Sequence, residues 1–226
     1  LVSKRERNTH NTINITAKTI GDSAFYGCKK LEKIVIPNSI NHIGNNAFNG
    51  CQSLQYNYEN LLRYLGNENN KYLYLCHGDY KFYLRDVKIN NNCKIIAQRT
   101  FYDCDLITSV TIPTSVISIG DSAFYSCQSL VSINIPNSVT KIGESTFEGC
   151  SALLEADVPS SVELIEKRAF YNCKDLKKIT INNKDCEIKG AAHTISNSGT
   201  TFDGTIYAAD DSKAKEYAEE YNRLFK

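Results

Sequence analysis

Residues 31–51 read "LEKIVIPNSINHIGNNAFNGC", and this stretch decides the fold because close copies of it recur along the chain. The shared pattern is L-x-x-I-x-I-P-x-S-V-x-x-I-G-x-x-A-F-x-x-C, with its best copies beginning at Leu31, Ile107, Leu130 and Leu153. One slot holds cysteines, 23 residues apart within each run: Cys28 and Cys51, then Cys104, Cys127, Cys150 and Cys173. Another slot holds Phe25, Phe48, Phe101, Phe124, Phe147 and Phe170. Such a period indicates a solenoid of stacked units.

Each unit is expected to contain a short strand, a corner and a short helical turn. The spacing of Leu31, Ile34 and Ile36 suits a strand with one buried face. Proline then ends the strand, and all four prolines share that slot: Pro37, Pro113, Pro136 and Pro159. In "DSAFYSC", Asp and Ser signal a helix start, so Ala, Phe and Cys are predicted on one helical turn. Equivalent residues of stacked units should then form ladders about 4.8 Å apart.

The repeat pattern resembles the BspA-like leucine-rich repeats, also called the Treponema pallidum class. The resemblance covers roughly Ile13 to Ile181, and the irregular segments look like companions of such repeats in surface proteins of gut Firmicutes. It implies a leucine-rich-repeat right-handed superhelix of 23-residue units, either α/β or mainly β. It also implies an exported, non-catalytic cell-surface module used in adhesion. This chain carries Ser39, Ser115, Ser138 and Ser161 where the common repeat has Asn, so an asparagine ladder is not expected.

Two segments depart from the repeat, and we expect both to belong to one continuous domain. The solenoid is assigned to 1–182, with an irregular hairpin insertion at 55–83 that leaves the solenoid and packs on its side. Its strands are predicted at Tyr72–Leu75 and Tyr80–Leu84, with "CHGD" as the turn. Its many tyrosines either shield a broken core edge, the favoured interpretation, or form a recognition patch. Residues 183–226 are expected to cap the solenoid with a strand and a helix over 211–225, although that helix could instead bind a partner.

Composition excludes several classes of function. Among 226 residues, 42% are apolar and the net charge is +1, which disfavours a nucleic-acid or anionic-membrane partner. No apolar run approaches the ~20 residues needed for membrane insertion. The chain lacks Met entirely, so it looks like a processed or trimmed segment, and the missing signal peptide says nothing about compartment. An extracellular, cell-surface location, with the signal peptide removed, is what the family resemblance implies. We also expect a monomer.

The recurring cysteines could be metal ligands, disulfides, nucleophiles or core residues. A linear file of sulfurs cannot surround one zinc ion, and stacked Cβ atoms lie too far apart for ordinary disulfides. A nucleophile would be a single special residue rather than six equivalent ones. We therefore predict buried thiols and no cofactor, and only Cys76 and Cys186, outside the ladder, are candidates for reactivity. The acidic pair Glu155 and Asp157 is the single candidate for glycan-active catalysis, and it lies on one strand, so an enzyme is not expected.

Outward residues of the strands form the preferred binding hypothesis. A stripe of small and polar side chains is predicted at Lys33/Val35, Asp86/Lys88, Ser109/Thr111, Ser132/Asn134, Glu155/Asp157 and Lys178/Thr180. A second exposed row follows the phenylalanines: Tyr26, Asn49, Tyr102, Tyr125, Glu148 and Tyr171. Tyr102 and Tyr125 should be neighbours and could contact a protein or glycan. The partner would be a protein or glycan on host or neighbouring cells. The alternatives are ordinary solvated surface and a structural spacer without a ligand.

Overall fold

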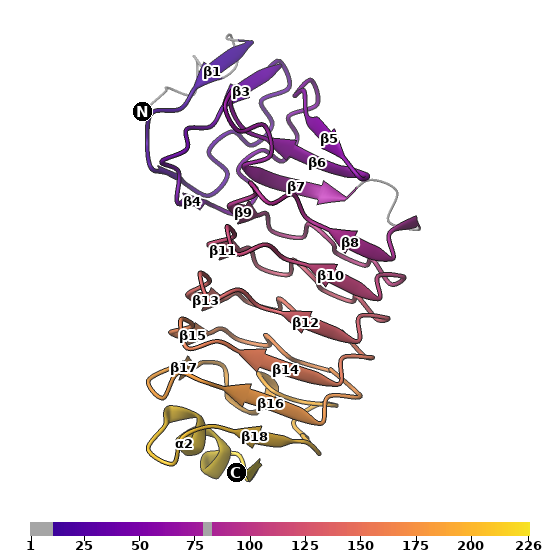
Figure 1. The fold of residues 1–226 in the computed structure, drawn as a ribbon, viewed down its shortest axis with the longest axis vertical. Helices are drawn as coiled ribbons and strands as arrows, with labels where there is room; N and C mark the ends of the chain where they lie inside the picture. The colour runs from indigo at the N-terminus through magenta and orange to yellow at the C-terminus, as the bar shows by residue number, and fades with distance from the viewer. Residues whose placement is uncertain (1–10, 79–82) are drawn as a thin grey trace.

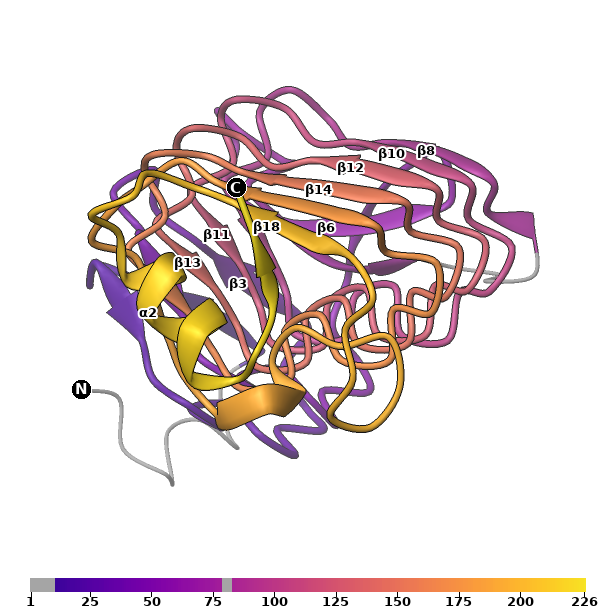
Figure 2. The ribbon, with the colours of Figure 1, turned by 90° about the horizontal axis from the view of Figure 1, so that it is seen from below.

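A computed structural model describes residues 11–78 and 83–226 as a β-solenoid of about nine stacked coils (Figure 1). Each regular coil has three sides, which enclose a core when viewed along the solenoid (Figure 2). The first face carries β1 (Thr12–Asn14), β3 (Lys33–Val35), β8 (Asp86–Lys88), β10 (Ser109–Thr111), β12 (Ser132–Asn134), β14 (Glu155–Val158), β16 (Lys178–Ile181) and β18 (Thr205–Tyr207). The second face carries β2 (Thr19–Ile20), β4 (His42–Ile43), β9 (Ile95–Ile96), β11 (Ser118–Ile119), β13 (Lys141–Ile142), β15 (Leu164–Ile165) and β17 (Glu187–Ile188). The turn face carries the A-F-x-x-C segments.

Strands of successive coils run parallel, and the register follows the repeat. Ile133 of β12 pairs with Ala156 of β14, and Ala156 pairs with Ile179 of β16. These middle residues point inward and are buried, whereas their neighbours on β12 and β14 point outward. The predicted alternation of the strand therefore holds, because a strand side chain changes sides at every residue. The leucine-rich-repeat solenoid of 23-residue units is thus confirmed.

The predicted helical turn is wrong, because the turn face is built from consecutive tight turns. Ser122 and Ser126 adopt left-handed φ angles of 54° and 58°, and the corresponding residues of the other turns do the same. A right-handed α-helix cannot contain residues with left-handed φ angles at every fourth position. Every second amide instead bonds to the next coil, as when Phe124 N–H donates to Thr146 O at 2.9 Å. The turn segments therefore form a third hydrogen-bonded ladder.

The phenylalanine slot lies inside this ladder and forms a column of stacked rings. Phe101, Phe124, Phe147 and Phe170 are fully buried, with adjacent centroids 5.2, 5.5 and 5.3 Å apart. Phe25 and Phe48 form a separate stack at 5.6 Å. The edge of Tyr74 meets Phe48, at 5.7 Å between centroids, so Tyr74 ends that second column. The column is interrupted at the irregular segment.

The irregular segment does not leave the solenoid, contrary to prediction. β5 (Asn57–Glu59), β6 (Leu62–Leu65) and β7 (Tyr74–Gly78) form an antiparallel meander, and β7 also pairs in parallel with β9. Cys76, His77 and Gly78, expected in a turn, belong to β7, while Tyr80 and Phe82 lie outside the described residues. Leu62 and Tyr64 join the larger of two hydrophobic clusters, and Leu65 and Tyr74 join the other. β6 and β7 of the meander are therefore packed between two cores, whereas β5 stays partly exposed.

The ladders continue past residue 182 before the chain ends. β17 pairs with β15, and β18 pairs with β16, so residues 183–207 complete a further coil. Helix α2 (Lys213–Glu220) then covers the end of the core with Ala214, Tyr217 and Ala218. The Ser212 side chain caps α2 by accepting a hydrogen bond from Lys215 N–H at 3.2 Å.

Helix α2 is shorter than the predicted helix over 211–225. Asn222 takes a left-handed φ of 52°, and Arg223 N–H bonds to Ala218 O at 2.7 Å, which closes a Schellman motif. Leu224 and Phe225, expected on the helix, form β19 (Leu224–Phe225) parallel to β18. Leu224 is exposed rather than buried. Asn222 was the sequence signal for this ending.

Candidate binding surfaces

The predicted stripe on the first face points to solvent. Lys33, Asp86, Lys88, Ser109, Thr111, Ser132, Asn134, Glu155 and Asp157 are exposed, and Val35, Lys178 and Thr180 are half-buried. From β8 to β10, and from β12 to β16, the strands hold them in straight rows because each pair is in register with the pair of the adjacent coil. Lys33 and Val35 are set apart, because β3 pairs with β1 in a separate sheet. β10 and β12 lie side by side, so the rows continue from β8 to β18 (Figure 1). The structure therefore brings most of the predicted residues together on one open surface.

The acidic members of the stripe each bind a neighbouring side chain. Asp86 accepts hydrogen bonds from Ser109 Oγ at 2.8 Å and from Thr108 Oγ1 at 3.1 Å. Glu155 forms an ion pair with Lys178 at 3.7 Å, and Asn182 Nδ2 donates to Asp157 Oδ1 at 2.7 Å. Each acidic residue thus has a different partner in its own or the adjacent coil, and no acid–base pair is formed between Glu155 and Asp157.

The sequence missed the last coil of this surface. Thr205 and Tyr207 of β18 pair with Lys178 and Thr180 and extend the same two rows. The Lys178 Nζ lies 5.6 Å from the Tyr207 ring centroid, within cation–π range. The alternation in "GTIYA" was the available signal, but β18 has no following proline or A-F-x-x-C segment to mark it as a repeat.

The second predicted row, on the turn face, is only partly exposed. Tyr102 and Tyr125 stack as predicted, with centroids 4.6 Å apart and planes 5° apart. The Arg99 guanidinium lies over Tyr102 at 5.1 Å. Both rings are half-buried, and each gives one face to the other. The pair therefore presents ring edges and hydroxyls rather than two open aromatic faces.

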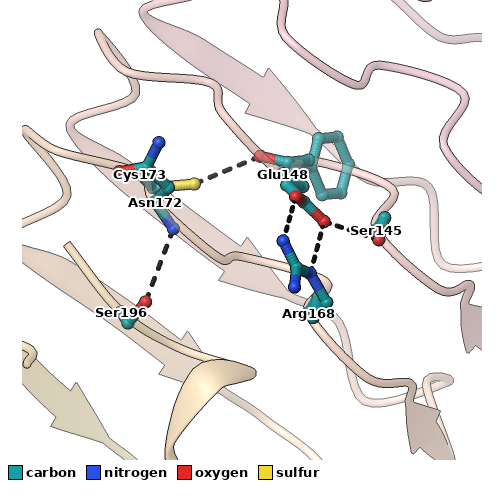
Figure 3. Close-up of polar contacts among 7 residues, drawn as sticks. Ser145, Glu148, Arg168, Asn172, Cys173 and Ser196 are labelled. Carbon is teal, nitrogen blue, oxygen red and sulfur yellow. Dashed lines mark hydrogen bonds and ion pairs between the residues drawn. The ribbon is translucent and has the colours of Figure 1, made fainter. Parts of the chain in front are cut away.

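Glu148 was expected to be exposed in this row, but it is buried. Its carboxylate accepts two hydrogen bonds from Arg168, at 2.9 Å to Nε and 2.5 Å to Nη2, and a third from Ser145 Oγ at 2.6 Å (Figure 3). Only 8% of its side chain is exposed. These hydrogen bonds raise the pKa of Arg168. Arg168 also stacks on Tyr171 at 4.1 Å, so this part of the row is structural.

The ladder cysteines are buried free thiols. Most donate S–H to the phenylalanine carbonyl of the preceding coil, as Cys173 does to Phe147 O at 3.2 Å (Figure 3). Cys51, Cys127 and Cys150 make the same bond at 3.1–3.2 Å. Burial raises the pKa of Cys51 to about 11 and that of Cys150 to about 12. The thiols are therefore protonated and engaged at neutral pH.

The two cysteines expected to be reactive differ from each other. Cys186 is fully buried, and burial raises its pKa to about 11. Cys76 is half-buried, and burial raises its pKa well above the usual value. Across the described ranges, 11–78 and 83–226, no three His, Cys, Asp or Glu side chains gather as a metal site requires. In the same ranges, no helix has the length and apolar character needed to cross a bilayer.

Comparison with known families decides the identity of the repeat. The pattern of the BspA type leucine rich repeat region matches six copies over residues 5–72 and 78–198. The chain belongs to this family. The family is defined by a leucine-rich-repeat scaffold, and no enzyme family is indicated. Comparison with curated protein sequences gave no match.

Two solved structures of bacterial proteins share this BspA-type fold. A leucine rich cell surface protein from Faecalibacterium prausnitzii A2-165 is 24% identical with a TM-score of 0.64, and the alignment covers 94% of this chain and 63% of that one. The pneumococcal vaccine antigen PcpA is 16% identical with a TM-score of 0.60, covering 95% and 66%. The chain therefore spans less than two thirds of either structure.

Proposed function

We propose that this chain is a non-catalytic recognition module of a cell-surface protein, and that the stripe on the first face is its binding surface. The carrying observation is that two adjacent parallel sheets, β8–β10 and β12–β14–β16–β18, leave one side open to solvent. Parallel sheets are usually covered on both sides. An open, rigid, repetitive face suits a partner that makes many small contacts along the solenoid.

The middle of the stripe is the part best suited to an external ligand. Lys88, Thr111, Ser132 and Asn134 are exposed, and no hydrogen bond or ion pair within the described residues occupies their side chains. Small hydroxyl and amide groups allow close approach and both donate and accept hydrogen bonds. The partner class is a protein or glycan on a host or neighbouring cell. Surface location of this chain rests on its family and on the cell-surface protein that shares its fold.

The test is a screen followed by a paired set of variants. The chain would be applied to a glycan array and to immobilised extracellular-matrix proteins, and each hit would be measured by biolayer interferometry. The double substitution Thr111→Arg and Ser132→Arg should weaken binding at least tenfold by obstructing the stripe. Thr140→Arg places the same residue at an exposed site away from the stripe and should change nothing. Binding that survives the double substitution would contradict this surface, and the absence of any hit would favour a spacer.

A further inference from the structure

The turn face is interrupted once, at the coil that contains the meander. Ala97 N–H donates to Leu75 O, as Gly120 N–H donates to Ile96 O one coil later. Cys76 therefore occupies the slot that Ala97 and Gly120 occupy in the following coils. Beyond Cys76 the chain continues as β7 to Gly78. Among residues 11–78 and 83–226, no turn segment lies between residues 46–51 and 97–102. A cavity of about 420 Å³ lies at this position.

The cavity is lined by residues from both sides of the gap. Ala97, in the slot that Gly120 fills one coil later, forms part of its wall. Asn49, Gln52, Tyr56, Tyr74, Cys76 and Arg99 contribute to the remaining walls. In the described chain the lining contains one cationic residue and no carboxylate.

Backbone groups on both sides of the gap lack the bonds that intact coils make. In the preceding turn, the amides of Ser23, Phe25 and Gly27 donate to the next coil at 2.8 Å. The corresponding amides of Asn46, Phe48 and Gly50 find no acceptor among residues 11–78 and 83–226. Across the gap, the carbonyls of Gln98 and Thr100 likewise receive no hydrogen bond there. A peptide backbone carries both amide donors and carbonyl acceptors. It can therefore pair with these two facing rows of unused donors and acceptors.

At the C-terminal end of the turn ladder, an extended segment pairs with the last turn. Phe170 N–H donates to Thr194 O at 2.8 Å, and Ser196 N–H donates to Phe170 O at 3.2 Å. Residues 194–196 read "TIS" and carry no A-F-x-x-C motif, yet Ile195 is fully buried against the ladder. An extended segment without the repeat sequence can therefore complete a rung.

We propose that the gap between residues 46–52 and 97–99 binds an extended peptide segment of a partner protein as the missing rung of the turn ladder. Its carbonyls would accept from the amides of Asn46, Phe48 and Gly50, and its amides would donate to the carbonyls of Gln98 and Thr100. Tyr74 already fills the inner aromatic position beside Phe48, so the inward side chains of the peptide must be small. Arg99 favours a neutral or acidic segment. This site lies on a different face from the stripe and does not depend on it.

The probe is a phage-displayed octapeptide library selected on the folded chain, with the best peptide labelled for fluorescence anisotropy. Gln52 and Gln128 follow ladder cysteines in equivalent slots, and both are exposed, but only Gln52 lines the gap. Gln52→Trp should weaken binding at least tenfold by filling the gap, whereas Gln128→Trp should leave it unchanged. A peptide with N-methyl groups at alternate amides should also bind at least tenfold more weakly.

Cys76 reports where the peptide sits, because it lines the cavity and is the half-buried cysteine. Saturating peptide should slow its alkylation by iodoacetamide, followed by mass spectrometry, at least fivefold. The proposal is overturned if the library gives no binder, if binding is unaffected by Gln52→Trp or by N-methylation, or if Cys76 alkylation is unchanged. The Thr111→Arg, Ser132→Arg double variant should bind the peptide normally, so this test and that of the stripe fail independently.

Discussion

The coils before and after Phe101 share the same repeat, but only the coils after it form an uninterrupted turn ladder. From Phe101 to Phe170 every coil supplies a ring, a thiol and a turn to an unbroken ladder. Between Phe48 and Phe101 one coil supplies an antiparallel meander instead, and its last strand, β7, pairs in parallel with β9 of the second face. The turn ladder of the regular part is continuously hydrogen-bonded, whereas the interrupted part has a cavity and, among the described residues, backbone groups without a hydrogen bond. Regular repetition removes polar edges, and a single irregular coil creates them.

The phenylalanine column allows the largest test of this comparison. Phe124 is fully buried between two stacked rings, whereas Phe48 has one stacked ring, one edge contact and 8% exposure. We expect Phe124→Ala to lower the free energy of unfolding by about 5 kcal/mol, and Phe48→Ala by about 3 kcal/mol, because Tyr74 can move into space beside the gap. Urea unfolding followed by circular dichroism measures both. Equal losses would show that the interrupted coil packs as tightly as the others.

The meander offers a matched pair of tyrosines with opposite exposure. Tyr64 is fully buried and its hydroxyl accepts from Asn90 N–H at 3.2 Å, whereas Tyr58 is 58% exposed. Tyr64→Ser should cost about 4 kcal/mol of unfolding free energy, from a cavity and a lost hydrogen bond. Tyr58→Ser should cost less than about 1 kcal/mol, the scale of an exposed cation–π contact with Arg63.

Tyr64→Phe separates the two contributions at that position, since it keeps the ring and removes the hydroxyl. We expect it to cost about 1 kcal/mol. If Tyr58→Ser lowers the unfolding free energy as much as Tyr64→Ser in thermal and urea unfolding, the buried side chains of the meander are not what stabilises it.

The sequence predicted the solenoid because each structural slot is sampled many times. Cysteine, phenylalanine and proline recur at 23 residues, and that period fixed the coil, the strand face and the register of the ladders. Local structure was predicted less well. Ser122 and Arg168 sit at left-handed positions without being glycine, so the turn segments looked helical. The partner of Glu148 lies 20 residues away, and nothing local distinguishes a glutamate that binds arginine from a solvated one.

The sequence located the irregular segment but did not predict how it packs, and the reason is physical. One copy of an irregular segment gives no repetition from which to infer its contacts. Tyr64 and Tyr74 are buried because β6 and β7 pass between two cores, and that arrangement depends on long-range pairing rather than on local pattern.

The ion pair of Glu148 on the turn face and that of Glu155 on the first face differ in burial, as Tyr64 and Tyr58 do. Glu148 is buried and receives three hydrogen bonds, whereas Glu155 is 67% exposed and lies 3.7 Å from Lys178. Glu148→Gln should lower the unfolding free energy by about 2 kcal/mol, a value limited by the 45% exposure of Arg168. Glu155→Gln should change it by less than about 0.5 kcal/mol. Raising the salt concentration should diminish the small effect and leave most of the larger one.

The smallest expected effect is that of a buried thiol on how the unfolding free energy changes with pH. Valines in the equivalent slot of other coils provide the control. Cys93 is fully buried in the slot held by Val116, Val139 and Val162, and burial raises its pKa to about 12. In the unfolded chain the thiol ionises near its usual pKa of about 8.5. Between these values the unfolded state binds fewer protons than the folded state. Stability is therefore fully present below about pH 8.5 and is lost as pH rises towards 12.

Cys93→Val should remove one thiol from this alkaline loss without creating a cavity. Between about pH 9.5 and 11, the unfolding free energy of the variant should fall less steeply than that of the wild type, by about 1.4 kcal/mol per pH unit. Val139→Cys, in the same slot two coils later, should steepen the fall by a similar amount. Urea titrations at four pH values in this window provide the slopes. If Cys93→Val leaves the slope unchanged, water already reaches this thiol, and the coil next to the gap is less tightly closed than the regular coils that follow it.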